Sequence, residues 1–144
     1  MVISNDPMSN FLFRVIIGPE LRGNFARVSG LENEIEFEEY REGGVNDGVY
    51  YFPTNIRHSR LILERGVMNL NPMEAWYSAV LSGVMIRYSG MIMLINSFGI
   101  PMKIWAFKDA YPVKYVGPEL NAQSSEVAVT RMEIIHGGLE VVPI

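Results

Sequence analysis

Residues 110–129 read AYPVKYVGPELNAQSSEVAV and join two runs of strand-forming residues through a Gly-Pro turn. The first run, Tyr111 to Val116, is aromatic and β-branched, and the second, Glu126 to His136, follows a polar stretch. Asn and Ser side chains readily bond to nearby backbone, so we expect the turn to fix the geometry between the strands. An ordinary polar loop is the alternative. The turn residues are Gly117, Pro118, Asn121, Ser124 and Ser125.

The rest of the chain repeats this pattern of strands and turns. Aromatic and β-branched runs bounded by Gly, Pro, Asn or Ser predict about six or seven strands, without βαβ alternation. We therefore predict a mainly β fold, an antiparallel sandwich or partly closed barrel with one α-helix, as a single domain over residues 1–144. The other strand-like segments are Phe11–Ile17, Phe25–Leu31, Glu32–Tyr40, Ser59–Arg65, Tyr88–Asn96 and Met102–Asp109.

One segment has helical periodicity. Apolar side chains between Met73 and Leu81 recur at i, i+3, i+4, i+7 and i+8, which places them on one stripe. Asn71 and Pro72 are typical of a helix start, and Gly83 is typical of a helix end. We predict a helix from Asn71 to Ser82 that packs its apolar stripe against the sheet.

Carboxylates alternate with apolar side chains along residues 32–40, and this period of two indicates a strand. Ile35 and Phe37 fall on the face opposite the carboxylates. Four neighbouring carboxylates cannot be buried without partners, so their face must meet bulk water or a water-filled space. The carboxylates are Glu32, Glu34, Glu36 and Glu38.

Residues 43–57 contain too much Gly, Asn and Pro for a regular central strand. We therefore expect a long loop, and such a connection is uncommon in an isolated domain and often functional. The residues of this loop that we expect to make contacts are Gly43, Gly44, Asn46, Asp47, Tyr50, Tyr51, Phe52 and Arg57.

Composition narrows the classes of function. Charged residues make up 19% and hydrophobic residues 49%, and this apolar surplus suggests surface covered by other subunits. The net charge of −4 disfavours binding to nucleic acid or anionic membranes. Cysteine is absent, so disulfides and thiolate metal sites do not hold the fold together. The first residues lack the pattern of a signal peptide, and we expect a soluble protein made in the cytoplasm.

The sequence has no motif of a catalytic or cofactor site. Phosphate-binding glycine loops, the nucleophile elbow and the HExxH motif are absent. His58 and His136 are far apart in the sequence and have no cluster of further ligands. The regular stripe of glutamates lacks the single acid in an apolar pocket that paired-carboxylate hydrolysis needs. We predict a non-enzyme with no catalytic residue, no cofactor and no metal.

Four motifs give the chain a family resemblance. They are Val28-Ser29-Gly30-Leu31, Glu39-Tyr40-Arg41-Glu42-Gly43-Gly44, Leu63-Glu64-Arg65-Gly66 and the stretch of residues 110–129. With these motifs in the family's order, the region from Phe11 to Leu139 resembles the tail tube proteins of T4-like contractile phages. The same family includes inner tube proteins of phage-derived contractile injection systems. Residues 49–53 are more aromatic than the basic or polar stretch that the family leads us to expect.

The resemblance implies hexameric rings in which the inner sheets join into one β-barrel around a lumen, with the rings stacked into a tube. It implies that the acidic strand lines the lumen, that Ser59 to Arg65 is its partner, and that the 43–57 loop reaches a neighbouring subunit or ring. The implied partners are further copies of the chain, a sheath protein, baseplate, spike and terminal cap proteins, and cargo, either a protein effector or DNA. No membrane is implied. The particle would be a phage tail or a phage tail-like particle, including one released from the cell.

Two alternatives stay open. A tube initiator next to the baseplate would share the family's fold. A stand-alone β-barrel module that binds a small apolar ligand belongs to a different class, and it would remain a monomer where a tube protein forms rings.

Overall fold

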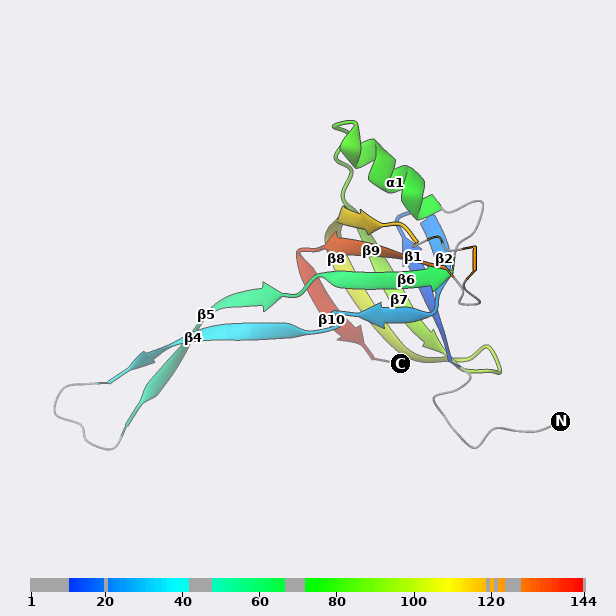
Figure 1. Ribbon diagram of the computed structural model, residues 1–144. Coiled ribbons are helices and arrows are strands. Elements are labelled where there is room, and N and C mark those ends of the chain that lie inside the picture. Colours follow the sequence, from blue (N-terminus) through cyan, green and yellow to red (C-terminus); the bar gives the residue numbers. More distant parts are fainter. Residues whose placement is uncertain are drawn as a thin grey trace.

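The computed structural model describes residues 11–19, 21–41, 48–66, 72–118, 120, 122–123 and 128–143 (Figure 1). This part of the chain folds into ten strands and one helix. They are β1 (Leu12–Ile17), β2 (Leu21–Phe25), β3 (Arg27–Ser29), β4 (Asn33–Tyr40), β5 (Tyr50–His58), β6 (Leu61–Gly66), α1 (Pro72–Leu81), β7 (Tyr88–Ile95), β8 (Pro101–Val116), β9 (Val129–Ile135) and β10 (Gly138–Val142).

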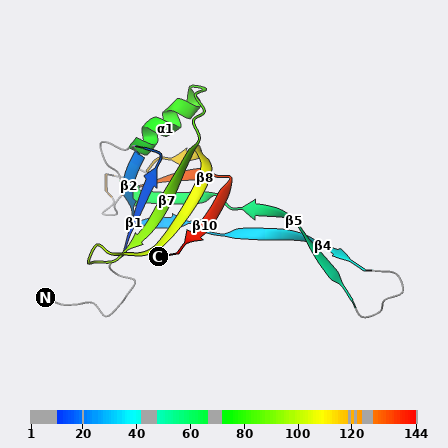
Figure 2. The ribbon, with the colours of Figure 1, turned by 180° about the vertical axis from the view of Figure 1, so that it is seen from behind.

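Eight strands form one curled antiparallel sheet. Its order is β2-β1-β7-β8-β9-β6-β3, and β10 pairs with β8 beside this path, so that β1, β7, β8 and β10 lie side by side (Figure 2). The two end strands, β2 and β3, are separated in sequence only by Ala26, whose N–H donates to the Glu64 carbonyl over 2.9 Å. The end strands do not pair with each other, so the sheet is not closed; the predicted mainly β, antiparallel fold with one helix is confirmed.

Strand β8 links the two halves of the barrel. Its first half pairs with β7 and β10, whereas residues from Tyr111 onward pair with β9. The prediction of two separate strands here is wrong, because the chain bends at Asp109 without ending the strand. Asp109 has a φ of 53°, a conformation that Asp tolerates better than most residues.

Two strands of this sheet were not predicted at all. β2 contains Gly23 and Asn24, which disfavour strands, and it is held in place by pairing with β1. β10 follows Gly137 and pairs with the first half of β8. Both are short segments that tertiary pairing places, and local sequence preference does not mark them.

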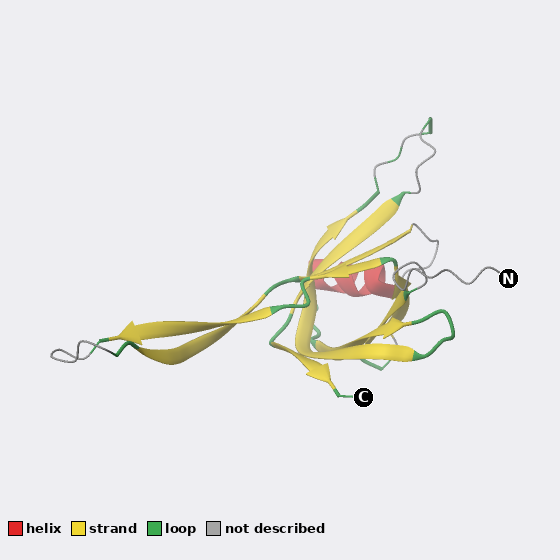
Figure 3. Ribbon diagram, turned by 90° about the horizontal axis from the view of Figure 1, so that it is seen from below, coloured by secondary structure: helices red, strands yellow, loops and turns green. Residues whose placement is uncertain are grey.

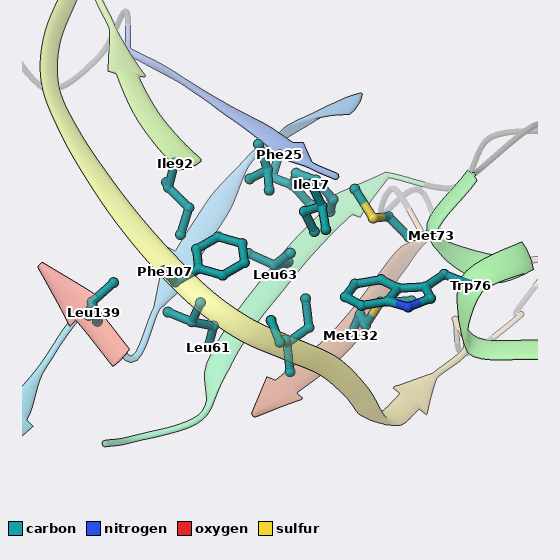
Figure 4. Close-up of a cluster of buried hydrophobic side chains, with 13 residues drawn as sticks. Ile17, Phe25, Leu61, Leu63, Met73, Trp76, Ile92, Phe107, Met132 and Leu139 are labelled. Atoms are coloured by element: carbon teal, nitrogen blue, oxygen red, sulfur yellow. The ribbon is translucent and has the colours of Figure 1, made fainter. Parts of the chain in front are cut away.

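The core lies between the curled sheet and α1 (Figure 4). The helix contributes Met73 and Trp76 to the core, and the Trp76 indole N–H donates to the Ile86 carbonyl over 3.1 Å. The predicted apolar stripe of the helix is buried only in part, since Leu81 is 71% exposed. The buried side chains labelled in Figure 4 are Ile17, Phe25, Leu61, Leu63, Met73, Trp76, Ile92, Phe107, Met132 and Leu139.

The end of α1 agrees with the prediction. Gly83 has a φ of 91°, its N–H donates to Val80, and the N–H of Val84 donates to Ala79. This pair of hydrogen bonds around a left-handed glycine is the Schellman motif, which satisfies the last carbonyls of a helix. The predicted cap, Asn71, lies outside the described residues.

Candidate assembly surface

A two-stranded hairpin projects from the barrel. β4 and β5 pair with each other in a separate sheet and extend well beyond the body (Figure 3). Two predictions are wrong here. Residues 50–58 form a strand, although a loop was expected. The partner of the acidic strand is β5, although Ser59 to Arg65 was expected. β6, which covers most of that segment, instead pairs with β3 and β9. Pro53 is tolerated because one edge of β5 has no partner strand among the described residues.

A β-bulge sets which side chains of the hairpin share a face. Ile35 lies opposite Ile56, but Phe37 lies opposite Pro53, so β5 carries one extra residue against β4 at this point. The extra residue reverses the alternation of β5 between its two halves. Without it, Ile56 would point to the opposite face from Tyr51 and Pro53.

One face of the hairpin is apolar and open to solvent. Ile35, Phe37, Tyr51 and Ile56 are between 56% and 62% exposed. The rings of Phe37 and Tyr51 meet edge to face, with centroids 5.3 Å apart and planes at 75°. Clustered apolar side chains with this exposure are typical of a surface that another molecule covers.

The other face carries the predicted carboxylates. Glu34, Glu36 and Glu38 share it by strand alternation, as predicted, and Arg57 joins them through an ion pair of 2.7 Å between its Nη2 and the Glu36 Oε1. The Thr54 hydroxyl also donates to the Glu36 carbonyl over 3.1 Å. This face is less purely acidic than the sequence indicated, because Tyr40, Tyr50 and Phe52 lie on it as well.

The joint between hairpin and body depends on one glycine. Gly30 follows β3, has a φ of 84°, and an added Cβ would lie 1.8 Å from the Arg60 carbonyl oxygen. Beyond the joint, the Ser59 hydroxyl donates to Glu32 Oε1 over 2.7 Å, so the fourth predicted carboxylate is held at the base of the hairpin. Glycine is therefore required at this position of the motif, because the backbone segments at Gly30 and Arg60 cross too closely for any side chain.

The base of the apolar face opens onto β10. The Asn33 amide donates to the Leu139 carbonyl over 3.1 Å. Between this contact and β8 lies an open cavity of about 510 Å³, lined on the hairpin side by Ile35 and Ile56 and on the body side by Phe107 and Leu139. The cavity is also lined by the exposed Lys108 and Glu140, and it lies on the apolar face of the hairpin, opposite the carboxylates.

Two histidines meet at this joint, a contact that no sequence pattern indicated. The rings of His58 and His136 lie 5.0 Å apart, and His136 Nε2 is 3.1 Å from the Ser59 carbonyl. The Nδ1 atoms of both rings are buried and have no hydrogen-bond partner among the described residues. Burial, reinforced by the neighbouring His58, lowers the pKa of His136.

The remaining predicted residues do not form a site. Gly117 and Pro118 follow β8 directly, as predicted. Within the described part of the chain, no group of three His, Asp or Glu side chains could hold a metal ion, and no helix is long and apolar enough to cross a membrane. Seven predicted residues lie outside the described residues: Gly43, Gly44, Asn46, Asp47, Asn121, Ser124 and Ser125.

Comparison with known proteins gives a consistent result. Residues 9–140 match the family model of the T4-like virus tail tube protein gp19. A chain of the anti-feeding prophage (AFP) baseplate is 28% identical over 97% of both chains, with a TM-score of 0.77. A chain of the AFP tube-terminating cap is 25% identical, covering 100% of this chain and 95% of that chain, with a TM-score of 0.81. No curated protein matches in sequence.

More distant structures share the fold alone. A chain of the sheath-tube complex of PVC, an extracellular contractile injection system, is 23% identical over 96% of this chain and 91% of that chain, with a TM-score of 0.81. Hcp1 from Flavobacterium johnsoniae is 15% identical over 90% of this chain and 94% of its own, with a TM-score of 0.55.

Proposed function

Because the chain belongs to the family of the T4-like virus tail tube protein gp19, we propose that it is a structural subunit of the inner tube of a contractile phage tail or contractile injection system. In this proposal six copies form a ring, the rings stack into a hollow tube, and contraction of a surrounding sheath drives the tube while cargo passes through it. The observation that carries the proposal is the projecting β4–β5 hairpin with its exposed apolar face.

The hairpin needs a partner on physical grounds. An isolated two-stranded sheet is marginally stable in water, and this one makes few contacts with its own body beyond the joint. Its apolar face includes Ile35, Phe37 and Ile56, each more than half exposed. A neighbouring copy in the same or the next ring would cover these side chains and so supply the missing burial.

In this proposal the carboxylate face of the hairpin lines the lumen. Glu34, Glu36 and Glu38, repeated around each ring, would repel DNA or acidic stretches of a protein cargo from this part of the wall and limit adhesion. The proposed partners outside the tube are the sheath protein, the baseplate and spike, and terminal cap proteins. We propose no enzymatic activity, synthesis in the cytoplasm and assembly into a tail or tail-like particle.

The proposal is tested by replacing two apolar side chains, one from each strand, on the apolar face of the hairpin. The double variant Phe37→Ser/Ile56→Ser should stay folded, since both side chains are exposed, but it should no longer form tubes. Phe98→Ser is the matched control, because Phe98 is 79% exposed in the β7–β8 turn, away from the hairpin. Electron microscopy and sedimentation measure assembly, and circular dichroism measures folding.

Each outcome separates the alternatives. Tubes from the double variant would contradict the role of the hairpin. A wild-type protein that remains monomeric would favour the stand-alone ligand-binding module, for which the cavity of about 510 Å³ beside Ile35 and Ile56 would be the candidate site. Single rings without tubes would favour the baseplate-proximal initiator of the same family.

A further inference from the structure

A cluster of cations lies on the outer side of β3, β6, β8 and β9. Arg27, Glu64, Arg131 and Val116 form one row across these strands, and Ser29, Ile62, Glu133 and Lys114 form the next. The side chains that alternate with them, such as Leu63 and Met132, are buried in the core, so both rows point away from it. Arg60 reaches the second row and pairs with Glu133.

The exposed groups of this cluster are positive. Four cations surround two carboxylates, which gives these six side chains a net charge of +2 in a chain whose total is −4. Side-chain exposure is 74% for Arg27 and 42% for Arg131, but 23% for Glu64 between them. Around Glu133, which is 12% exposed, Arg60 and Lys114 are 56% and 55% exposed. The carboxylates therefore lie beneath the cations.

Among the described residues, the ion pairs within the cluster leave donors free. Their N–O distances are between 3.6 and 3.9 Å, too long for strong hydrogen bonds, whereas the pair of Arg57 and Glu36 on the hairpin is 2.7 Å. Each guanidinium has five N–H donors in a planar fork that matches a carboxylate. The arginines can therefore bind a further carboxylate without first breaking a tight internal pair.

We infer that this cationic cluster binds acidic segments of a protein cargo. Charge complementarity favours carboxylates, and the apolar Ile62, Val116 and Val129 on the same face can contact the aliphatic parts of a peptide. Single-stranded nucleic acid is the less suitable ligand, since the registered rows present no aromatic ring for base stacking.

This inference rests on the proposed function for its place in the tube. In this inference the outer face of β6 and β9 also lines the lumen, at a different level from the hairpin carboxylates. The wall would then alternate between acidic bands that repel an acidic cargo and cationic bands that hold it. Such binding is weak per contact and sensitive to salt, which suits a cargo that is held before firing and released during it.

Fluorescence anisotropy with a labelled glutamate-rich peptide tests the inference on the full-length purified protein. At low salt the peptide should bind, and Arg27→Gln/Arg131→Gln should weaken binding by about tenfold, as expected for two lost exposed ion pairs. Arg60→Gln/Lys114→Gln is the second variant and should show a similar loss. Arg14→Gln/Arg22→Gln is the matched control with the same charge change on β1 and β2, and it should bind as the wild type does.

The results that would overturn the inference are distinct from those that bear on the tube. Absence of peptide binding at low salt, an equal loss in the control variant, or preferential binding of a labelled single-stranded oligonucleotide would each refute it. Thermal unfolding shows whether every variant is folded. Electron microscopy of the same samples reports assembly separately, so a failure of the tube proposal is recognised by the absence of tubes, whether or not the peptide binds.

Discussion

Replacing Gly30 by alanine tests the joint that holds the hairpin. Gly30 has a φ of 84°, and a non-glycine residue in the left-handed region costs about 1–2 kcal/mol. The added Cβ would also lie 1.8 Å from the Arg60 carbonyl oxygen, so the backbone of the second arm has to move. Overpacking of this kind costs a further 1–3 kcal/mol or so, which gives a total of about 2–5 kcal/mol for Gly30→Ala.

Gly99→Ala is the matched control. Gly99 has a φ of 79°, but an added Cβ would meet nothing within 4 Å, so only the backbone cost of about 1–2 kcal/mol remains. The difference between the two variants isolates the clash at the joint. For a domain of this size it amounts to about 4–12 °C in Tm, with Gly30→Ala the less stable.

Differential scanning calorimetry measures both variants against the wild type, and electron microscopy shows whether tubes form well below each Tm. Gly30→Ala should also lose tubes, because the hairpin is displaced relative to the body, while Gly99→Ala should keep them. A Gly30→Ala protein that is as stable as Gly99→Ala would refute the close crossing of the two arms. Loss of tubes by Gly99→Ala alone would refute the role of the joint in assembly.

Two further predictions concern charged groups. The triple variant Glu34→Gln/Glu36→Gln/Glu38→Gln should leave tubes intact and change the retention or passage of cargo. It loses one exposed ion pair, which contributes about 1 kcal/mol or less to stability. Failure of this variant to form rings would show that the carboxylates are structural. Burial and His58 lower the folded-state pKa of His136 from its ordinary 6.5, so below pH 6.5 the unfolded chain takes up a proton more readily than the folded protein. The folded state therefore has its full stability above pH 6.5 and loses stability as the pH falls below that value. His136→Asn should flatten this part of the profile of Tm against pH, and an unchanged acid limb would contradict the assignment.

The predicted β class and the position of α1 followed from local chemistry. Strand periodicity in Phe11 to Ile17 and the helical stripe around Trp76 both reflect a buried face, which local spacing records. Strand β5 was missed because Pro53 and the residues at the bulge interrupt its alternation, although Tyr50–Phe52 and Ile56 are strand formers. The extra residue of a bulge breaks the alternation along a strand. From the sequence alone such a break looks like a loop, because the partner strand is not known.

The carboxylate stripe of the candidate surface was predictable, but its surroundings were not. Alternation alone placed Glu34, Glu36 and Glu38 on one face, since successive side chains of any strand point to opposite sides. The pair of His58 and His136, and the cationic rows that join β3 to β9, bring together residues far apart in the chain. Such contacts depend on which strands become neighbours, and nothing in the local sequence specifies that.

Residue types and their spacing predicted an antiparallel β domain with one helix, an acidic strand and an apolar surplus that needs covering. Those properties follow from residue type and spacing, which act over a few residues at a time. That the acidic strand leaves the main sheet and pairs with β5 in a projecting hairpin became clear from the three-dimensional structure alone. The physical reason is that strand pairing is a long-range choice, made by register, by the bulge and by the close crossing at Gly30.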